Sequence, residues 1–152
     1  MPSFSITRRT HIEASQDRVR DFVEDFRKWS GWCPWEQDGV ELERSFAGPK
    51  RGVGATYAWA GKGHARTGTM VMTGAGDDGV DIDLLFTFPC PVRQQVRVEV
   101  TPAGEGTDVV WTMSGRHNWV GEFVFRVSAL ERRMGKDFED GLQRLKKLVE
   151  AA

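Results

Sequence analysis

Six short segments with strand-like alternation follow one another through the middle of the chain, and this run constrains the fold more than any other feature. The segments are Val40–Phe46, Val53–Ala60, Ala65–Thr73, Val80–Phe88, Val92–Thr101 and Thr107–Gly115. Short turns rich in glycine separate them, for example at 61–63 and 104–106. Parallel pairing needs a crossover of about a dozen residues or more, which these turns are too short to supply. The run therefore predicts an antiparallel meander.

The segments before and after the meander have different periods. Residues Phe4–Ile12 alternate between apolar and polar, which indicates an opening strand. Ser15 can cap a following helix, which we expect to stop near Trp29, with a short irregular helix or loop up to Gly39. The C-terminal stretch is apolar at three- and four-residue steps, at Val127, Leu130, Met134, Phe138, Leu142, Leu145 and Val149. This spacing predicts a helix of about six turns with one apolar face.

The order of elements predicts an α+β fold: a curved antiparallel sheet of about seven strands wrapped around a long C-terminal helix, with one or two short helices after the first strand. A chain of 152 residues can bury a sizeable core without disulfides or a metal. The sequence contains no obvious linker, repeat or low-complexity tract. We therefore expect residues 1–152 to form a single domain.

Composition and charge argue against several classes of function. The net charge of -1 gives no general attraction to nucleic acid or to anionic membranes. The N-terminus lacks the apolar stretch of a signal peptide, and no apolar run is long enough for a membrane span. Two cysteines, Cys33 and Cys90, are too few for a disulfide framework and are predicted to be free thiols. These features predict a cytoplasmic protein that binds no nucleic acid and inserts into no membrane.

Four segments of the sequence, in order along the chain, resemble segments of the START-like (SRPBCC) superfamily, which includes polyketide cyclases/dehydrases and lipid-transfer proteins. They are Asp25-x-x-x-Trp29-x-x-Trp32-x-Pro34-Trp35, Gly52-Val-Gly54-Ala-Thr-Tyr57-x-Trp59-x-Gly61, Thr107-x-Val109-x-Trp111-x-Met113-x-Gly115, and Gly135-Lys-Asp137-Phe138-Glu139-x-Gly141-Leu142-x-x-Leu145-Lys146. The resemblance implies the helix-grip fold, with a cavity between the strands and the last helix. Because that fold hosts carriers, enzymes and regulatory modules, it implies function less closely.

The candidate site combines large apolar residues that share a strand parity or a helix face with a few residues of the loops. The candidate ligand-binding residues are Trp32, Trp35, Tyr57, Trp59, Arg66, Met70, Met72, Phe86, Phe88, Trp111, Met113, Trp119, Leu130, Met134 and Phe138. These apolar side chains either fill a core or line an apolar cavity. The tryptophan cluster at 29–35 forms either a plug at one end of the core or a lid that contacts ligand. Arg66 either meets an acidic group of a ligand or lies at the surface.

The sequence carries no specific catalytic motif. It has no phosphate-binding loop, no His-Glu-x-x-His motif and no nucleophile elbow, and its three histidines are scattered. Acid–base catalysis by Tyr57, His64, Arg66 or His117 remains an alternative. We predict a protein that binds a hydrophobic or aromatic small molecule, lipid- or polyketide-like, without a metal or cofactor. A polyketide cyclase/dehydratase and a regulatory or interaction module are the alternatives, and the sequence does not distinguish a monomer from a homodimer.

Overall fold

The computed structural model describes residues 3–33, 42–61, 67–88, 92–116 and 122–152. Strand β1 (Ser3–Ile12) is followed by helix α1 (Gln16–Glu24) and by a short 3-10 helix, η1 (Phe26–Gly31). The strands that follow are β2 (Leu42–Ala47), β3 (Thr56–Gly61), β4 (Thr67–Gly76), β5 (Gly79–Phe88), β6 (Val92–Ala103) and β7 (Gly106–Arg116). Helix α2 (Glu122–Ala151) ends the chain.

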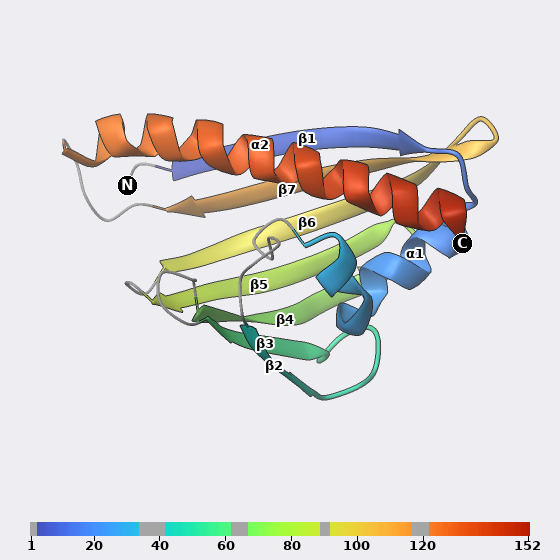
Figure 1. Ribbon diagram of the computed structural model, residues 1–152, viewed down its shortest axis with the longest axis horizontal. Helices are drawn as coiled ribbons and strands as arrows, with labels where there is room; N and C mark the ends of the chain where they lie inside the picture. Colours follow the sequence, from blue (N-terminus) through green and yellow to red (C-terminus); the bar gives the residue numbers. More distant parts are fainter. Residues whose placement is uncertain (1–2, 34–41, 62–66, 89–91, 117–121) are drawn as a thin grey trace.

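The strands form one antiparallel sheet in the order β1-β7-β6-β5-β4-β3-β2. From β2 to β7, consecutive strands pair with one another, as the short turns predict, and β1 pairs with β7. This arrangement confirms the predicted curved sheet with a long C-terminal helix. It leaves β1 and β2 as the two edges of the sheet (Figure 1).

All three helices lie on the same side of the sheet, which we call the inner face (Figure 1). Helix α2 runs alongside β1, where Lys146 Nζ donates to the carbonyl of His11 at 2.8 Å. Helix α1 crosses the C-terminal end of α2, and Arg18 Nη2 donates to the carbonyl of Val149 at 2.9 Å and to that of Ala152. Because the last carbonyls of a helix have no partner within it, this arginine caps α2.

The first helix ends earlier than the sequence predicts. Ser15 caps it as expected, with its Oγ accepting from the amide of Arg18 at 3.3 Å, but α1 stops at Glu24 instead of near Trp29. Asp25 adopts an extended conformation, and its carboxylate accepts from the amide of Arg27 at 3.0 Å. Asp25 therefore closes one helix and opens the next, η1, because its short polar side chain competes for backbone amides.

Three other boundaries also differ from the expectation. Strand β3 begins at Thr56, since Gly52 and Gly54 adopt positive φ angles of 85° and 93° and turn the chain before it. Strand β4 continues to Gly76, so the turn to β5 is tighter than predicted. Helix α2 has 30 residues, more than six turns. No helix in the described ranges is long and apolar enough to span a membrane.

Candidate functional site

Three rows of side chains cross the inner face, and the pairing register defines them. The first, the Trp111 row, contains Val80, Val98, Trp111 and Arg8. The second, the Met113 row, contains Met72, Ile82, Val96, Met113 and Ile6. The third, the Gln94 row, contains Tyr57, Met70, Leu84, Gln94 and Gly115. Apart from Arg8 and Gly115, these residues are at most 6% exposed, so the rows form a buried and largely apolar wall.

An aromatic cluster lies on the Trp111 row. Trp29 and Trp32, from η1 and its C-terminal end, have ring centroids 4.4 Å apart, and each ring is within 6 Å of Trp111, at 5.6 and 5.7 Å. Phe138 of α2 contacts Trp111 as well, with centroids 5.2 Å apart. Each of these four side chains is at most 1% exposed. Trp29 and Trp32 therefore belong to the core, as the plug interpretation expects, and not to a solvent-exposed rim.

Hydrogen bonds hold η1 over the inner face. Trp29 Nε1 donates to the carbonyl of Val23 at 2.9 Å, which ties η1 back to α1. Arg144 of α2 donates through Nη2 to the carbonyls of Trp32 and Cys33, at 3.4 and 3.2 Å. Carbonyls at a helix end need partners from outside the helix, and Arg144 supplies one. These contacts join η1, α1 and the second half of α2 into one packed layer.

Among the buried polar atoms that lack a hydrogen-bond partner within the described residues, two bear on the candidate site. They are Nε1 of Trp32, whose residue is 0% exposed, and Oε1 of Gln94, whose residue is 6% exposed. Several other buried polar side chains in the described ranges are hydrogen-bonded. Thr107 donates to the carbonyl of Ala14 at 2.7 Å, and Glu24 accepts from Arg20 and Arg51. Because most buried polar atoms are paired, Trp32 and Gln94 mark an unusual part of the interior.

Gln94 was not among the predicted site residues, although its position carries a signal. It shares strand parity with Val96, Val98 and Val100, which are all buried. In a half-buried strand the inward positions are expected to be apolar, so a glutamine at an inward position, in line with three buried valines of β6, breaks that pattern. Strand parity alone could therefore have identified Gln94 as a buried polar residue. The family resemblance and the large aromatic residues instead directed the prediction to apolar side chains.

The structure orients seven of the predicted site residues toward the inner face or into the core. These are Tyr57, Trp59, Met70, Met72, Trp111, Met113 and Phe138. Trp32 is brought against Trp111 by η1. Trp35, Arg66 and Trp119 lie outside the described residues, as do the alternative acid–base residues His64 and His117. Phe86, Phe88, Leu130 and Met134 belong to described elements, but their side chains lie outside the description.

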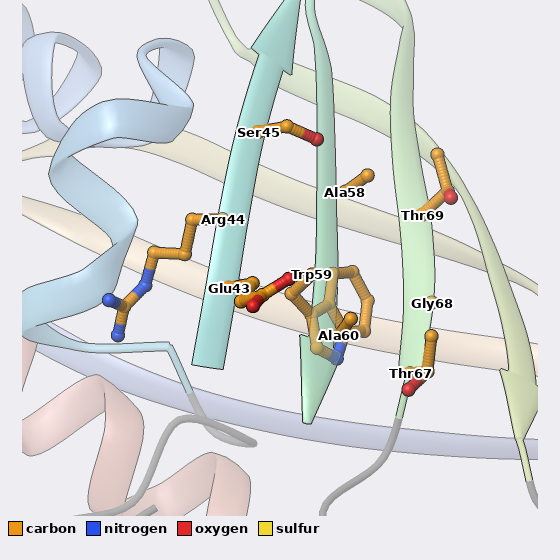
Figure 2. A pocket seen from close by; sticks show the side chains of 9 residues that line it. All are labelled: Glu43, Arg44, Ser45, Ala58, Trp59, Ala60, Thr67, Gly68 and Thr69. Atoms are coloured by element: carbon orange, nitrogen blue, oxygen red, sulfur yellow. The ribbon is translucent and has the colours of Figure 1, made fainter. Parts of the chain in front are cut away.

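A shallow depression of about 340 Å³ lies over β2, β3 and β4 (Figure 2). Most of its lining side chains have the outer-face parity and are short: Ser45, Ala58, Ala60, Thr67 and Thr69. Arg44 points away from them, toward the helices (Figure 2). A trough of short hydroxyl and methyl groups on the outer face is not the aromatic, methionine-rich cavity that the sequence predicts.

Four shifted pKa values belong to charged groups that lie away from the three rows. The hydrogen bond with Asp108 raises the pKa of His11, and the hydrogen bond with Lys146 lowers the pKa of Glu150. Hydrogen bonds with Glu24 and Asp81 raise the pKa values of Arg51 and Arg97. The shift of Glu150 comes from an ion pair within α2, and the other three come from ion pairs that join neighbouring elements or turns, as in structural salt bridges. The functional interest of the described interior therefore lies in its apolar rows and in the two unpaired polar atoms.

The sequence model of one protein family, described as polyketide cyclase / dehydrase and lipid transport, matches residues 3–150. No curated protein matches the chain by sequence. Many solved structures share the fold, however.

Three of these structures illustrate the range of similar proteins. TTHA0849 from Thermus thermophilus has a TM-score of 0.68 at 19% identity, with 97% of this chain and 98% of that one covered. The Aha1 dimer from Colwellia psychrerythraea has a TM-score of 0.64 at 15% identity, covering 97% and 96%. DynU16, a putative protein in the dynemicin biosynthetic locus, has a TM-score of 0.67 at 16% identity; the match covers 98% of this chain but 48% of DynU16. At such identities the likeness establishes the fold alone.

Proposed function

Because the chain belongs to the polyketide cyclase/dehydrase and lipid transport family, we propose that it binds a hydrophobic or aromatic small molecule between the inner face of the sheet and α2. The observation that carries this proposal is the Gln94 row. Tyr57, Met70 and Leu84 form a continuous apolar row across three strands, and the row ends at Gln94 beside a glycine, Gly115. An apolar wall with few polar groups is typical of small-molecule sites.

Helices cover the inner face at the Trp111 row, and Phe26 of η1 also reaches the Gln94 row, where its ring centroid lies 6.1 Å from that of Tyr57. Around the Trp111 row, η1, α1 and the second half of α2 pack into a closed core through Trp29, Trp32 and Phe138. The Gln94 row lies four residues farther along β6 than the Trp111 row, or about 13 Å at a strand rise of about 3.3 Å per residue. Methionines in the second and third rows, Met70, Met72 and Met113, have flexible side chains that suit an adaptable binding surface.

A pair of adjacent leucines provides the test. Leu84 faces inward and is 0% exposed, whereas Leu85, its neighbour in β5, faces the other way and is only half-buried. Phenylalanine at 84 would add bulk to the proposed site, and the same change at 85 would not. We expect Leu84→Phe to weaken binding of a fluorescent apolar probe by about tenfold or more, the cost of overfilling a packed apolar site.

Leu85→Phe is the matched control and should leave probe affinity unchanged, while circular dichroism confirms that both variants fold. Native mass spectrometry of the purified protein would show whether an apolar molecule co-purifies. The proposal fails if the wild-type protein binds no apolar probe, or if both variants bind the probe as the wild type does.

Tyr57 favours a second candidate function, a cofactor-independent cyclase or dehydratase. Its phenol is fully buried on the Gln94 row, so a ligand above that row would lie close to a group able to donate or accept a proton. Under this proposal Tyr57→Phe abolishes conversion of a synthetic poly-β-ketone while probe binding persists. Conversion by Tyr57→Phe at the wild-type rate would rule out Tyr57 as the catalytic residue.

A further inference from the structure

Trp32 Nε1 and Gln94 Oε1, which have no hydrogen-bond partner among the described residues, lie on either side of the Met113 row. Trp32 packs edge-on against Trp111, with ring planes at 90° and centroids 5.7 Å apart, so its indole is on the Trp111 row. Gln94 lies on the third row, directly opposite Leu84 and Gly115. The second row, with Met113, lies between them. The two side chains therefore bracket one strip of the inner face.

Neither unpaired atom is explained by packing alone. A buried donor or acceptor without a partner is destabilising, and an apolar side chain of similar shape would avoid that cost. The neighbouring Trp29 shows that this fold can satisfy an indole N–H, since its Nε1 donates to Val23. Gln94 lies between Leu84 and Gly115, neither of which carries a polar side chain. The two positions thus retain hydrogen-bonding groups where leucine or phenylalanine would pack.

The chemistry of the two atoms is complementary and specific. An indole Nε1 can only donate, and an amide Oε1 can only accept. A molecule that satisfied both would carry an acceptor near Trp32 and a donor near Gln94. The cations on neighbouring elements, Arg8 and Arg144, already bind Glu139 and two backbone carbonyls. A neutral carbonyl therefore fits the indole better than a carboxylate, whose burial without a counter-ion is costly.

We propose that the ligand of the inner face is a rigid oxygenated aromatic molecule whose carbonyl accepts a hydrogen bond from Trp32 Nε1 and whose hydroxyl donates one to Gln94 Oε1. Its apolar body would lie over the Met113 row. The Trp111 row, on which Trp32 packs, and the Gln94 row are about 13 Å apart along β6, which suits two or three fused rings with oxygens at opposite ends. This inference rests on the proposed function and narrows it, because a plain hydrocarbon chain would satisfy neither atom.

Two naphthalenes of similar size provide the binding test. The first, an acetylnaphthol, carries a carbonyl on one ring and a hydroxyl at the far end of the other. The second, an ethylnaphthalene, has neither group. We expect the wild-type protein to bind the acetylnaphthol about tenfold more tightly than the ethylnaphthalene, which corresponds to one or two buried hydrogen bonds. Gln94→Leu and Trp32→Phe should each reduce this preference, while affinity for the ethylnaphthalene is kept.

The outcomes separate this inference from the proposed function. If neither naphthalene binds, the proposed function fails and this inference fails with it. If both naphthalenes bind with equal affinity and the variants change neither affinity, the protein binds apolar molecules without hydrogen-bonding to their oxygens. Only this inference is then overturned. A preference that persists in both variants also overturns it, because other groups then make the hydrogen bonds.

A measurement without ligand checks the premise and does not depend on how Trp32→Phe folds. Gln94→Leu removes an unpaired acceptor and should raise the melting temperature of the ligand-free protein. The matched control is Gln95→Leu on the outer face, where Nε2 donates to Asp83 Oδ1 at 2.8 Å; it should not raise the melting temperature. A lower melting temperature for Gln94→Leu would show that the amide is already satisfied, and would overturn the inference.

Discussion

The guanidinium of Arg8 lies directly against Gly135, so that a Cβ atom at position 135 would overlap its Nη2 and Cζ atoms. The same guanidinium donates through Nε to Glu139 Oε1 at 3.0 Å and through Nη1 to the carbonyl of Thr7 at 2.8 Å. A glycine inside a helix costs about 1 kcal/mol relative to alanine. At Gly135 this cost has a structural reason, because the missing side chain leaves room for a charged group of β1.

Gly135→Ala should therefore stabilise the protein more when Arg8 is absent than when it is present. In the Arg8→Ala background we expect a gain of about 1 kcal/mol in the free energy of unfolding, the usual helix-propensity difference. In the wild-type background the gain should be smaller or reversed, because Arg8 must leave Glu139. Urea unfolding of the four proteins in this double-mutant cycle measures the coupling. An equal gain in both backgrounds would contradict the packing described.

The pH dependence of stability should include a contribution from His11. Its Nδ1 lies 2.8 Å from Asp108 Oδ1, and this hydrogen bond raises the pKa of His11 above its ordinary value of 6.5. A raised pKa in the folded state means that stabilisation is fully present below about pH 6.5 and is lost as the pH rises through the folded-state pKa. Thermal unfolding of wild type and Asp108→Asn across this range checks the sign: the variant should lose most of the effect, and Glu13, 3.1 Å from Nε2, accounts for the remainder. A His11 pKa at or below the ordinary value, measured by NMR, would refute the assignment.

Glu24 links α1 to the loop before β3, and its neutralisation should be costly. Its carboxylate accepts from Arg20 Nη2 at 2.7 Å and from Arg51 Nη2 at 2.8 Å, and its side chain is 9% exposed. Glu24→Gln should lower the free energy of unfolding by about 2 kcal/mol, the usual range for hydrogen bonds to charged groups. The control is Asp17→Asn: the Asp17 side chain is 92% exposed and lies 3.9 Å from Arg20, so its loss should cost less than about 0.5 kcal/mol. Urea unfolding compares the two variants, and equal effects would contradict this account.

Gly68 provides space for Trp59, one of the predicted site residues. A Cβ at position 68 would lie 2.8 Å from Cζ2 of that indole and 2.7 Å from the carbonyl oxygen of Leu85. Backbone cannot move aside cheaply, so Gly68→Ala should destabilise the protein by about 2 kcal/mol, as overpacking of a core does. Gly76→Ala in the same strand is the control, since a Cβ there would meet Asp78 Oδ1 at an ordinary 3.6 Å. Chemical denaturation compares the two variants, and a tolerated Gly68→Ala would show that Trp59 is free to shift.

Most of the fold followed from periodicity, because alternation and helical spacing reflect which side chains are buried. The opening strand, the six-strand meander and the final helix were all predicted near their observed positions. The error at α1 had a local cause: the apolar spacing of Val19, Val23 and Phe26 continues past Glu24, but the carboxylate of Asp25 caps a second helix. Helical spacing of apolar residues shows which side chains are buried. It does not show where a polar side chain binds backbone amides and ends the helix.

The candidate site was predictable only in part. Strand parity correctly grouped Tyr57 with Trp59 and Trp111 with Met113, because successive side chains on a strand face opposite sides. That Trp32 packs on Trp111 depends on η1, which brings together residues 79 positions apart in sequence, a contact that strand parity does not predict.

The sequence by itself determined the succession of strands along the chain, the long terminal helix and the residues that share a face, since each follows from local periodicity. Only the tertiary structure decided which face the helices cover and which buried polar atoms find partners. Trp29 and Trp32 are the same residue type three positions apart, yet one indole N–H is bonded to Val23 and the other has no partner among the described residues. Whether a polar atom is satisfied depends on neighbours that the fold assembles, and not on its own place in the chain.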